Sequence, residues 1–272
     1  MWRTLPLVLL VVLGGVCAAA QQPNTLTAAE KAAGWRLLFD GKSAAGWHPY
    51  GKANAGAPTK AQGWDVIDGT LVALGKGTAS TDDIVTNDEF DNFELELDWK
   101  VAPQANSGIF YGVVEGKDGI YATGPEYQLI DEDHWPDPLE VWQKNGADYA
   151  MHPPLVKSAK PVGKWNHARI VVNGTHIENW LNGQMTAGFE RWTPEWESLK
   201  KAGKWKDYPQ YGMAKQGKLG LQNHGNMTWF QNIKVRSRTR LSGYGLLRFG
   251  DSESYKTRMP LPIAGSLRDV PL

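Results

Sequence analysis

The residues best suited to chemistry lie in one central stretch, residues 106–131, which reads as two strands around a glycine-rich turn. In residues 126–130 polar and apolar side chains alternate, and alternate residues of a strand share a face. Glu126 and Gln128 are therefore expected side by side on one face. Asp131 follows and opens an acidic turn. These groups suit either a solvated sheet edge or the floor of a site for a polar ligand such as a sugar.

Other polar side chains fall at the ends of predicted strands. Asn106 begins the central stretch, and Gln222 and His224 follow the strand predicted near residues 218–222. A carboxylate and an imidazole can share acid and base roles when their environments separate their pKa values. A single histidine in a loop is also typical of an ordinary surface residue. The residues alone leave both interpretations open.

Short strands must position these groups. Residues 93–101 alternate strictly, so the apolar residues are predicted to be buried and the charged row to face solvent rather than a groove. Hairpins are predicted across Asp68-Gly69 and Asn173-Gly174. Two short helices are predicted, with Thr27 and Thr193 as N-caps. Many short strands with few helices indicate an all-β, antiparallel two-sheet jelly-roll sandwich in one domain.

The N-terminal residues resemble an export signal. A charged start, an apolar run too short to span a bilayer and small residues at 18–20 predict that residues 1–20 are cleaved. The protein is then periplasmic or extracellular. Lipid anchoring at Cys17 is less favoured, because Val16 is bulky where a small residue is expected. Residues 21–240 form the predicted sandwich, and residues 241–272 form a C-terminal extension of unknown role.

Composition narrows the classes of function. With 29 basic and 29 acidic residues and no basic cluster, the chain lacks the footprint of a nucleic-acid-binding protein. Its apolar run is too short to predict a transmembrane segment, and its single cysteine cannot form a disulfide within the chain. No zincin, P-loop or Gly-x-Ser-x-Gly motif appears. We expect no cofactor and assign no metal ligands. A requirement for a divalent cation and the oligomeric state are left open.

Five motifs in order resemble one family, the 3-keto-disaccharide hydrolases. The resemblance runs from about Gly34 to Arg236, nearly the whole predicted mature chain. It implies a concanavalin A-like sandwich and an enzyme of the glycosidase type that acts on glycosides oxidised at C3. The motifs are Asn-Ser-Gly-Ile-Phe-Tyr (106–111), Gly-Pro-Glu-Tyr-Gln (124–128), Gly-x-Trp-Asn (163–166), Trp-Leu-Asn-Gly (180–183), and Leu-Gln-x-His-Gly (221–225) followed by Trp-Phe-x-Asn-Ile (229–233).

The implied chemistry needs a base, an acid and donors to an enolate oxygen. A ketone at C3 acidifies the C2 proton, so a base removes it, the C1 substituent leaves and water adds back. Glu126 is the expected base and His224 the expected acid. Asp131 is expected to orient either group or to replace Glu126 as base. The expected sugar contacts are Asn106, Tyr111, Gln128, Trp180 and Gln222.

Two positions depart from the family pattern. Asn223 stands where the family often has Asp, which would leave His224 less basic, and Gln231 stands where it often has Arg. The alternative function is therefore a non-catalytic, lectin-like carbohydrate-binding module. A structural or adhesion domain has little support beyond the fold. The enzyme hypothesis predicts that Glu126, Asp131 and His224 converge on one groove.

Overall fold

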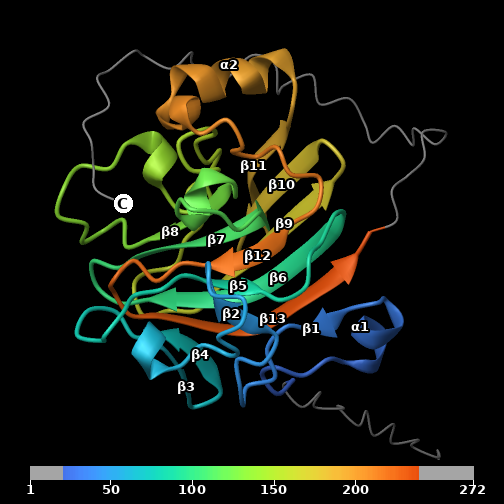
Figure 1. Cartoon of the computed structure of the whole chain (residues 1–272), viewed down its shortest axis with the longest axis vertical. Coiled ribbons are helices and arrows are strands. Elements are labelled where there is room, and N and C mark those ends of the chain that lie inside the picture. Colours follow the sequence, from blue (N-terminus) through green and yellow to red (C-terminus); the bar gives the residue numbers. More distant parts are fainter. Residues whose placement is uncertain (1–20, 239–272) are drawn as a thin grey trace, which may run out of the picture.

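The computed structural model describes residues 21–238, which form two antiparallel sheets packed face to face (Figure 1). The predicted signal segment, residues 1–20, and the C-terminal extension, residues 241–272, lie outside the described residues. The two-sheet antiparallel fold itself was predicted and is confirmed. Within residues 21–238, no helix is long and apolar enough to cross a membrane.

The larger sheet has eight strands in the order β11-β10-β9-β6-β13-β4-β3, with β1 also paired to β13. Its strands are β1 Arg36–Leu37, β3 Trp64–Ile67, β4 Thr70–Ala73, β6 Phe93–Val101, β9 Asn166–Asn173, β10 His176–Leu181, β11 Gln184–Glu190 and β13 Thr228–Ser237. The smaller sheet has the order β2-β5-β12-β7-β8. Its strands are β2 Trp47–Pro49, β5 Ile84–Thr86, β7 Asn106–Val113, β8 Glu126–Ile130 and β12 Lys218–Leu221.

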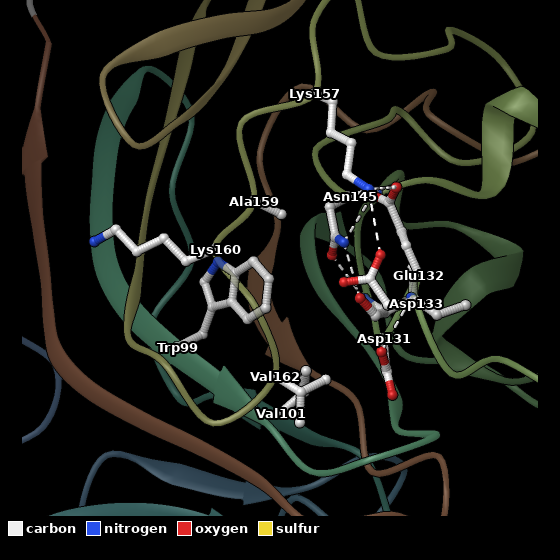
Figure 2. A pocket seen from close by; sticks show the side chains of 11 residues that line it. Trp99, Val101, Asp131, Glu132, Asp133, Asn145, Lys157, Ala159, Lys160 and Val162 are labelled. Atoms are coloured by element: carbon white, nitrogen blue, oxygen red, sulfur yellow. Dashed lines mark hydrogen bonds and ion pairs between the residues drawn. The ribbon is translucent and has the colours of Figure 1, made fainter.

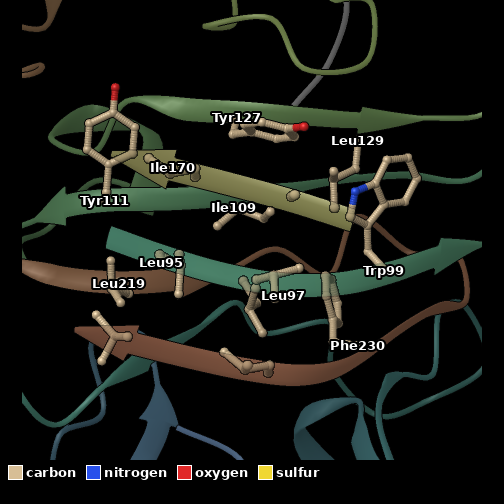
Figure 3. Close-up of a cluster of buried hydrophobic side chains, with 14 of the residues drawn as sticks. Leu95, Leu97, Trp99, Ile109, Tyr111, Tyr127, Leu129, Ile170, Leu219 and Phe230 are labelled. Carbon is tan, nitrogen blue, oxygen red and sulfur yellow. The ribbon is translucent and has the colours of Figure 1, made fainter. Parts of the chain in front are cut away.

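The core lies between the sheets (Figure 3). Each strand contributes alternate side chains, because successive residues of a strand point to opposite faces. The predicted burial of the apolar face of β6 is confirmed: Phe93, Leu95, Leu97 and Trp99 are each at most 2% exposed. From the smaller sheet, Ile109 of β7 and Tyr127 and Leu129 of β8 meet them. The opposite face of β8 therefore presents Glu126 and Gln128, as predicted.

The two α-helices begin as their sequences predict and lie at opposite ends of the view in Figure 1. Helix α1 spans Ala28–Ala32, with a capping box between Thr27 and Glu30. Helix α2 spans Pro194–Ala202, and the Thr193 hydroxyl accepts a hydrogen bond from the backbone N–H of Trp196. Four 3₁₀ turns complete the fold: η1 Lys60–Gln62, η2 Ile120–Ala122, η3 Val141–Gln143 and η4 Lys204–Asp207.

The structure adds two strands that the sequence pattern did not predict, and it changes the interpretation of β6. Strand β2 pairs with β5 at the edge of the smaller sheet, and strand β11 pairs with β10 at the edge of the larger sheet. The charged row of β6 does not simply face solvent. Glu94 is only 2% exposed, because Arg169 and Arg236 both donate to its carboxylate from the neighbouring strands.

Candidate functional site

The candidate site lies on the outer face of the smaller sheet, where Glu126 extends over a glycine. Gly108 pairs with Gln128 across the β7–β8 ladder, and Glu126 pairs with Phe110. A Cβ atom added to Gly108 would overlap the Glu126 carboxyl group, with Cγ and Cδ of Glu126 only 2.8 Å away. Any larger residue at position 108 would displace this side chain. The glycine of the first motif therefore makes room for the carboxyl of the second.

Glu126 has the environment of a carboxyl that holds its proton. The residue is 5% exposed, and burial raises its pKa to about 8. Lys204 opposes this rise through its positive charge, whereas the charges of Asp83 and Asp148 add to it. At neutral pH most Glu126 side chains are therefore protonated.

Lys204 brings a positive charge to Glu126 from a distant part of the chain. It begins η4 and extends over aromatic rings, with Nζ 4.7 Å from the centroid of Tyr149 and 5.4 Å from that of Trp205. The Lys204 ammonium also donates to the Tyr149 hydroxyl at 3.4 Å. Burial lowers the pKa of Lys204, although the charge of Glu126 opposes the change. No sequence motif signalled Lys204 or Tyr149.

His224, in the loop after β12, is also influenced by the positive charge of Lys204. Burial lowers its pKa, and the positive charges of Lys204 and Lys76 lower it further. The imidazole is therefore neutral at pH 7. Glu126 and His224 thus share Lys204 as an electrostatic neighbour. At neutral pH the carboxyl of Glu126 therefore holds its proton, and the imidazole of His224 is free to accept one.

Asn223 fixes the loop that carries His224. Its Nδ2 donates to the backbone oxygen of Gly63 at 3.0 Å, and its Oδ1 accepts from the N–H of Gly225 at 3.3 Å. The Asn223 backbone N–H donates to the Asp83 carboxylate at 2.9 Å. A side-chain carboxylate at position 223 would face the Gly63 carbonyl oxygen. The departure at Asn223 therefore suits this loop.

The other departure, Gln231, lies away from the site. It pairs with Asp98 in the β13–β6 ladder of the larger sheet, and a hydrogen bond from Gln231 helps to lower the Asp98 pKa. Gln231 therefore lies on the sheet opposite to the one that carries Glu126.

Asp83 is a second carboxyl group of the site that the sequence analysis missed. It precedes β5, whose Ile84 packs in the core and whose Val85 packs on the outer face with Phe110. Alternation therefore places Asp83 on the face that bears Glu126. Burial raises the Asp83 pKa to about 7, and its negative charge raises the pKa of Glu126. The sequence feature that could have pointed to Asp83 is its position directly before the short strand β5.

Carboxamide groups flank the two carboxyl groups. Nε2 of Gln128 donates to Oδ1 of Asn106 at 3.2 Å, which ties two predicted sugar contacts together. Gln222 directly follows the neighbouring strand β12, and its backbone N–H donates to the Gly108 oxygen at 3.0 Å. Oε1 of Gln128 and Oε1 of Gln222 are buried and have no hydrogen-bond partner within residues 21–238. Buried acceptors of this kind need a donor from water or a ligand.

Asp131 does not join this group. Its carboxylate accepts hydrogen bonds from the backbone N–H groups of Gln104, Asp133 and His134, which fixes the turn after β8. These bonds help to hold the pKa of Asp131 below its usual range, although burial opposes them. Asp131 lines a separate cavity with Trp99 and Lys157 (Figure 2), and Glu126 does not line it. Glu126 and His224 share Lys204 as a charged neighbour, whereas the Asp131 carboxylate is bound to the backbone of its own turn.

The two aromatic candidates also lie elsewhere. Tyr111 is 1% exposed and packs between the sheets (Figure 3), because it shares a face of β7 with Ile109. Trp180 lies on β10 of the larger sheet, where its indole N–H donates to Glu178 and its ring packs on Arg169. Asn106, Gln128 and Gln222 are thus the predicted sugar contacts that the fold places beside Glu126.

These groups define an acid–base site on one face of a β-sandwich: a protonated carboxyl, a neutral imidazole and an ammonium group whose charge acts on both. Among residues 21–238, no group of three or more His, Cys, Asp or Glu side chains is arranged to hold a metal ion. The arrangement can transfer protons and stabilise a developing oxyanion through its own side chains.

Comparison with known proteins identifies the family. Residues 34–236 match the 3-keto-alpha-glucoside-1,2-lyase-like domain, and the chain belongs to this family. A curated relative from Bacteroides thetaiotaomicron, named 3-keto-disaccharide hydrolase, is 33% identical over 246 residues, which cover 80% of this chain and 83% of the relative. The predicted class, a glycosidase-type hydrolase, is thereby confirmed.

Solved structures agree with the fold. A crystal structure from Parabacteroides distasonis, named "a putative glycosyl hydrolase", shares 38% identity and covers 80% of this chain and 100% of its own, with a TM-score of 0.73. A second structure of that name and organism shares 27% identity, covers 75% and 99% of the two chains, and has a TM-score of 0.56.

Proposed function

We propose that this protein cleaves glycosides oxidised at C3 by removing the C2 proton, eliminating the C1 substituent and adding water. The family and the name of the curated relative support this substrate class. The single observation that carries the mechanism is the opposite shift of two pKa values around Lys204. The pKa of Glu126 is raised to about 8, and that of His224 is lowered.

The protonation states favour His224 as the base and Glu126 as the acid. The neutral imidazole of His224 accepts the C2 proton, and the C–H electron pair forms an enolate whose negative charge lies on the C3 oxygen. The ammonium group of Lys204 supplies a positive charge that stabilises this oxygen. When the enolate collapses, the C1–O bond breaks. The protonated carboxyl of Glu126 then donates its proton to the departing oxygen.

Two substrates with different leaving groups test this assignment. A sugar alkoxide needs a proton as it leaves, whereas p-nitrophenolate leaves without one. Glu126→Gln should therefore slow cleavage of a 3-keto-disaccharide about 100-fold or more, but change cleavage of p-nitrophenyl 3-keto-glucoside only a few-fold. His224→Gln should slow both reactions by a similar factor, because C2 deprotonation precedes either departure. Initial rates on purified protein measure both effects.

The matched control is His134→Gln, since His134 is a loop histidine bound to Asp131 and outside the Glu126 face. Its rates should equal those of the wild type. Equal losses on both substrates in Glu126→Gln would make Glu126 the base and overturn the assignment. Wild-type protein that binds the 3-keto-glycoside but cleaves neither substrate would instead be a carbohydrate-binding module.

A further inference from the structure

We infer that Asp83 and Gln222 hold and activate the water molecule that completes hydrolysis, which makes Asp83 a second catalytic carboxyl group. This inference rests on the proposed function, because the elimination step creates the C1=C2 double bond that the water attacks. It assigns the two halves of the reaction to different carboxyl groups: Glu126 serves the departure of the C1 substituent, and Asp83 serves the hydration.

Strand register places the two carboxyl groups on either side of Gln222. Ile84 of β5 pairs with Leu221 of β12, and Leu221 pairs with Ile109 of β7. One residue further along the three strands, Asp83, Gln222 and Gly108 therefore form a row across the sheet. The Glu126 carboxyl extends over Gly108 and completes this row. Asp83 and Glu126 thus face the same space from opposite sides of Gln222.

The row provides acceptors for both hydrogens of a water molecule. Gln222 is only 8% exposed, and its buried Oε1 atom has no hydrogen-bond partner in the described part of the chain. Oδ1 of Asp83 accepts the Asn223 N–H, whereas Oδ2 has no hydrogen-bond partner among residues 21–238. A buried water usually satisfies polar groups that have no protein partner. One O–H of a water can bind Gln222 Oε1, while the other points at Asp83.

The chemical balance of the step is complete with these groups. Asp83 accepts a proton from the water, and the resulting hydroxide oxygen forms a bond to C1. The C1=C2 electron pair moves into the enolate, with negative charge on the C3 oxygen. His224 returns to C2 the proton that it removed earlier. The proton on Asp83 returns through solvent to Glu126, which gave its own proton to the departing oxygen. No oxidant, reductant or further co-reactant is needed. Burial raises the Asp83 pKa to about 7, which suits a base that works near neutrality.

The test separates release of the leaving group from formation of the hydrated sugar. With p-nitrophenyl 3-keto-glucoside, p-nitrophenolate reports elimination, and chromatography with mass detection reports both 3-keto-glucose and the enone that is lighter by one water. In Asp83→Asn, p-nitrophenolate release should stay within about threefold of the wild type. Formation of 3-keto-glucose should fall about 100-fold, the usual scale for loss of a general base, and the enone should accumulate.

Asparagine retains an oxygen that can accept the Asn223 N–H, so Asp83→Asn preserves the contact that fixes the His224 loop. A second variant, Gln222→Met, removes the orphan acceptor at similar volume and should show the same separation at about 10-fold. Asp65→Asn is the matched control. Asp65 lies on β3 of the larger sheet and pairs with Lys60 of η1, so its replacement should leave both rates unchanged.

Equal slowing of both steps in Asp83→Asn and Gln222→Met, or no change in either step, would overturn the inference while leaving the proposed function intact. Wild-type protein that releases no p-nitrophenolate would refute the proposed function itself.

Discussion

Replacing Glu126 with Gln should stabilise the protein in a way that depends on pH. Glutamine has the same shape but no proton to lose. Glu126 is 5% exposed, and its carboxylate form is penalised by burial, which raises the pKa from the ordinary value of 4.5 to about 8. The pKa of Glu126 is higher in the folded state than in the unfolded state. Its contribution to stability is therefore fully present below pH 4.5. That stability is lost as the pH rises through 8.

The magnitude follows from the size of the pKa change. At about 1.4 kcal/mol per pKa unit, a rise from 4.5 to about 8 corresponds to about 5 kcal/mol above pH 8, and to about 3 kcal/mol at pH 7. Glu126→Gln should therefore unfold at nearly the same temperature as the wild type at pH 4.5. At pH 8.5 its Tm should be higher by about 10–20 °C, using roughly 2–4 °C per kcal/mol for a chain of this size.

Thermal unfolding followed by circular dichroism across pH 4.5–9 measures this effect. Asp65→Asn is a suitable control, because Asp65 forms a surface ion pair and its replacement should give a small, nearly constant difference from the wild type. A Tm difference between Glu126→Gln and the wild type that did not grow with pH would show that Glu126 has no buried, protonated state. The assignment of Glu126 as an acid would then fail with it.

Four further outcomes are expected. The kcat/KM for a 3-keto-disaccharide should rise through the His224 pKa, below 6.5, and fall near pH 8 as Glu126 ionises; a steady rise above pH 8 would contradict this. Lys204→Met should lower kcat about 100-fold and move the alkaline limb of the pH–rate profile upward, because Lys204 lowers the Glu126 pKa; an unmoved limb would place Lys204 outside the site. Glu94→Gln should lower the free energy of unfolding, measured in urea at pH 7, by about 3 kcal/mol, because it leaves Arg169 and Arg236 without their carboxylate. A loss under about 1 kcal/mol would show that the two ion pairs of Glu94 contribute no more than exposed ones. Intact-mass measurement of exported protein should show that residues 1–20 are absent, whereas acyl chains on Cys17 would indicate a lipoprotein.

Local pattern determined much of the fold and one side of the site. The period of two in residues 93–101 and 126–130 was sufficient to predict which side chains enter the core. It therefore also placed Glu126 and Gln128 on the opposite face. The helix caps at Thr27 and Thr193 could also be predicted from local sequence, because each cap is an interaction between residues three apart.

Register between distant strands decided what surrounds Glu126. Asp83, Lys204 and Tyr149 lie far from each other in sequence, and each becomes a neighbour of Glu126 only through strand pairing and the packing of η4. Asp131 is as acidic as Glu126 in the sequence, yet backbone N–H groups of its own turn occupy its carboxylate.

Burial likewise decided protonation. A carboxyl group and an imidazole have ordinary pKa values in a sequence. In the folded protein, desolvation raises the pKa of the Glu126 carboxyl, which keeps its proton. Desolvation and the charge of Lys204 lower the pKa of the His224 imidazole, which loses its proton.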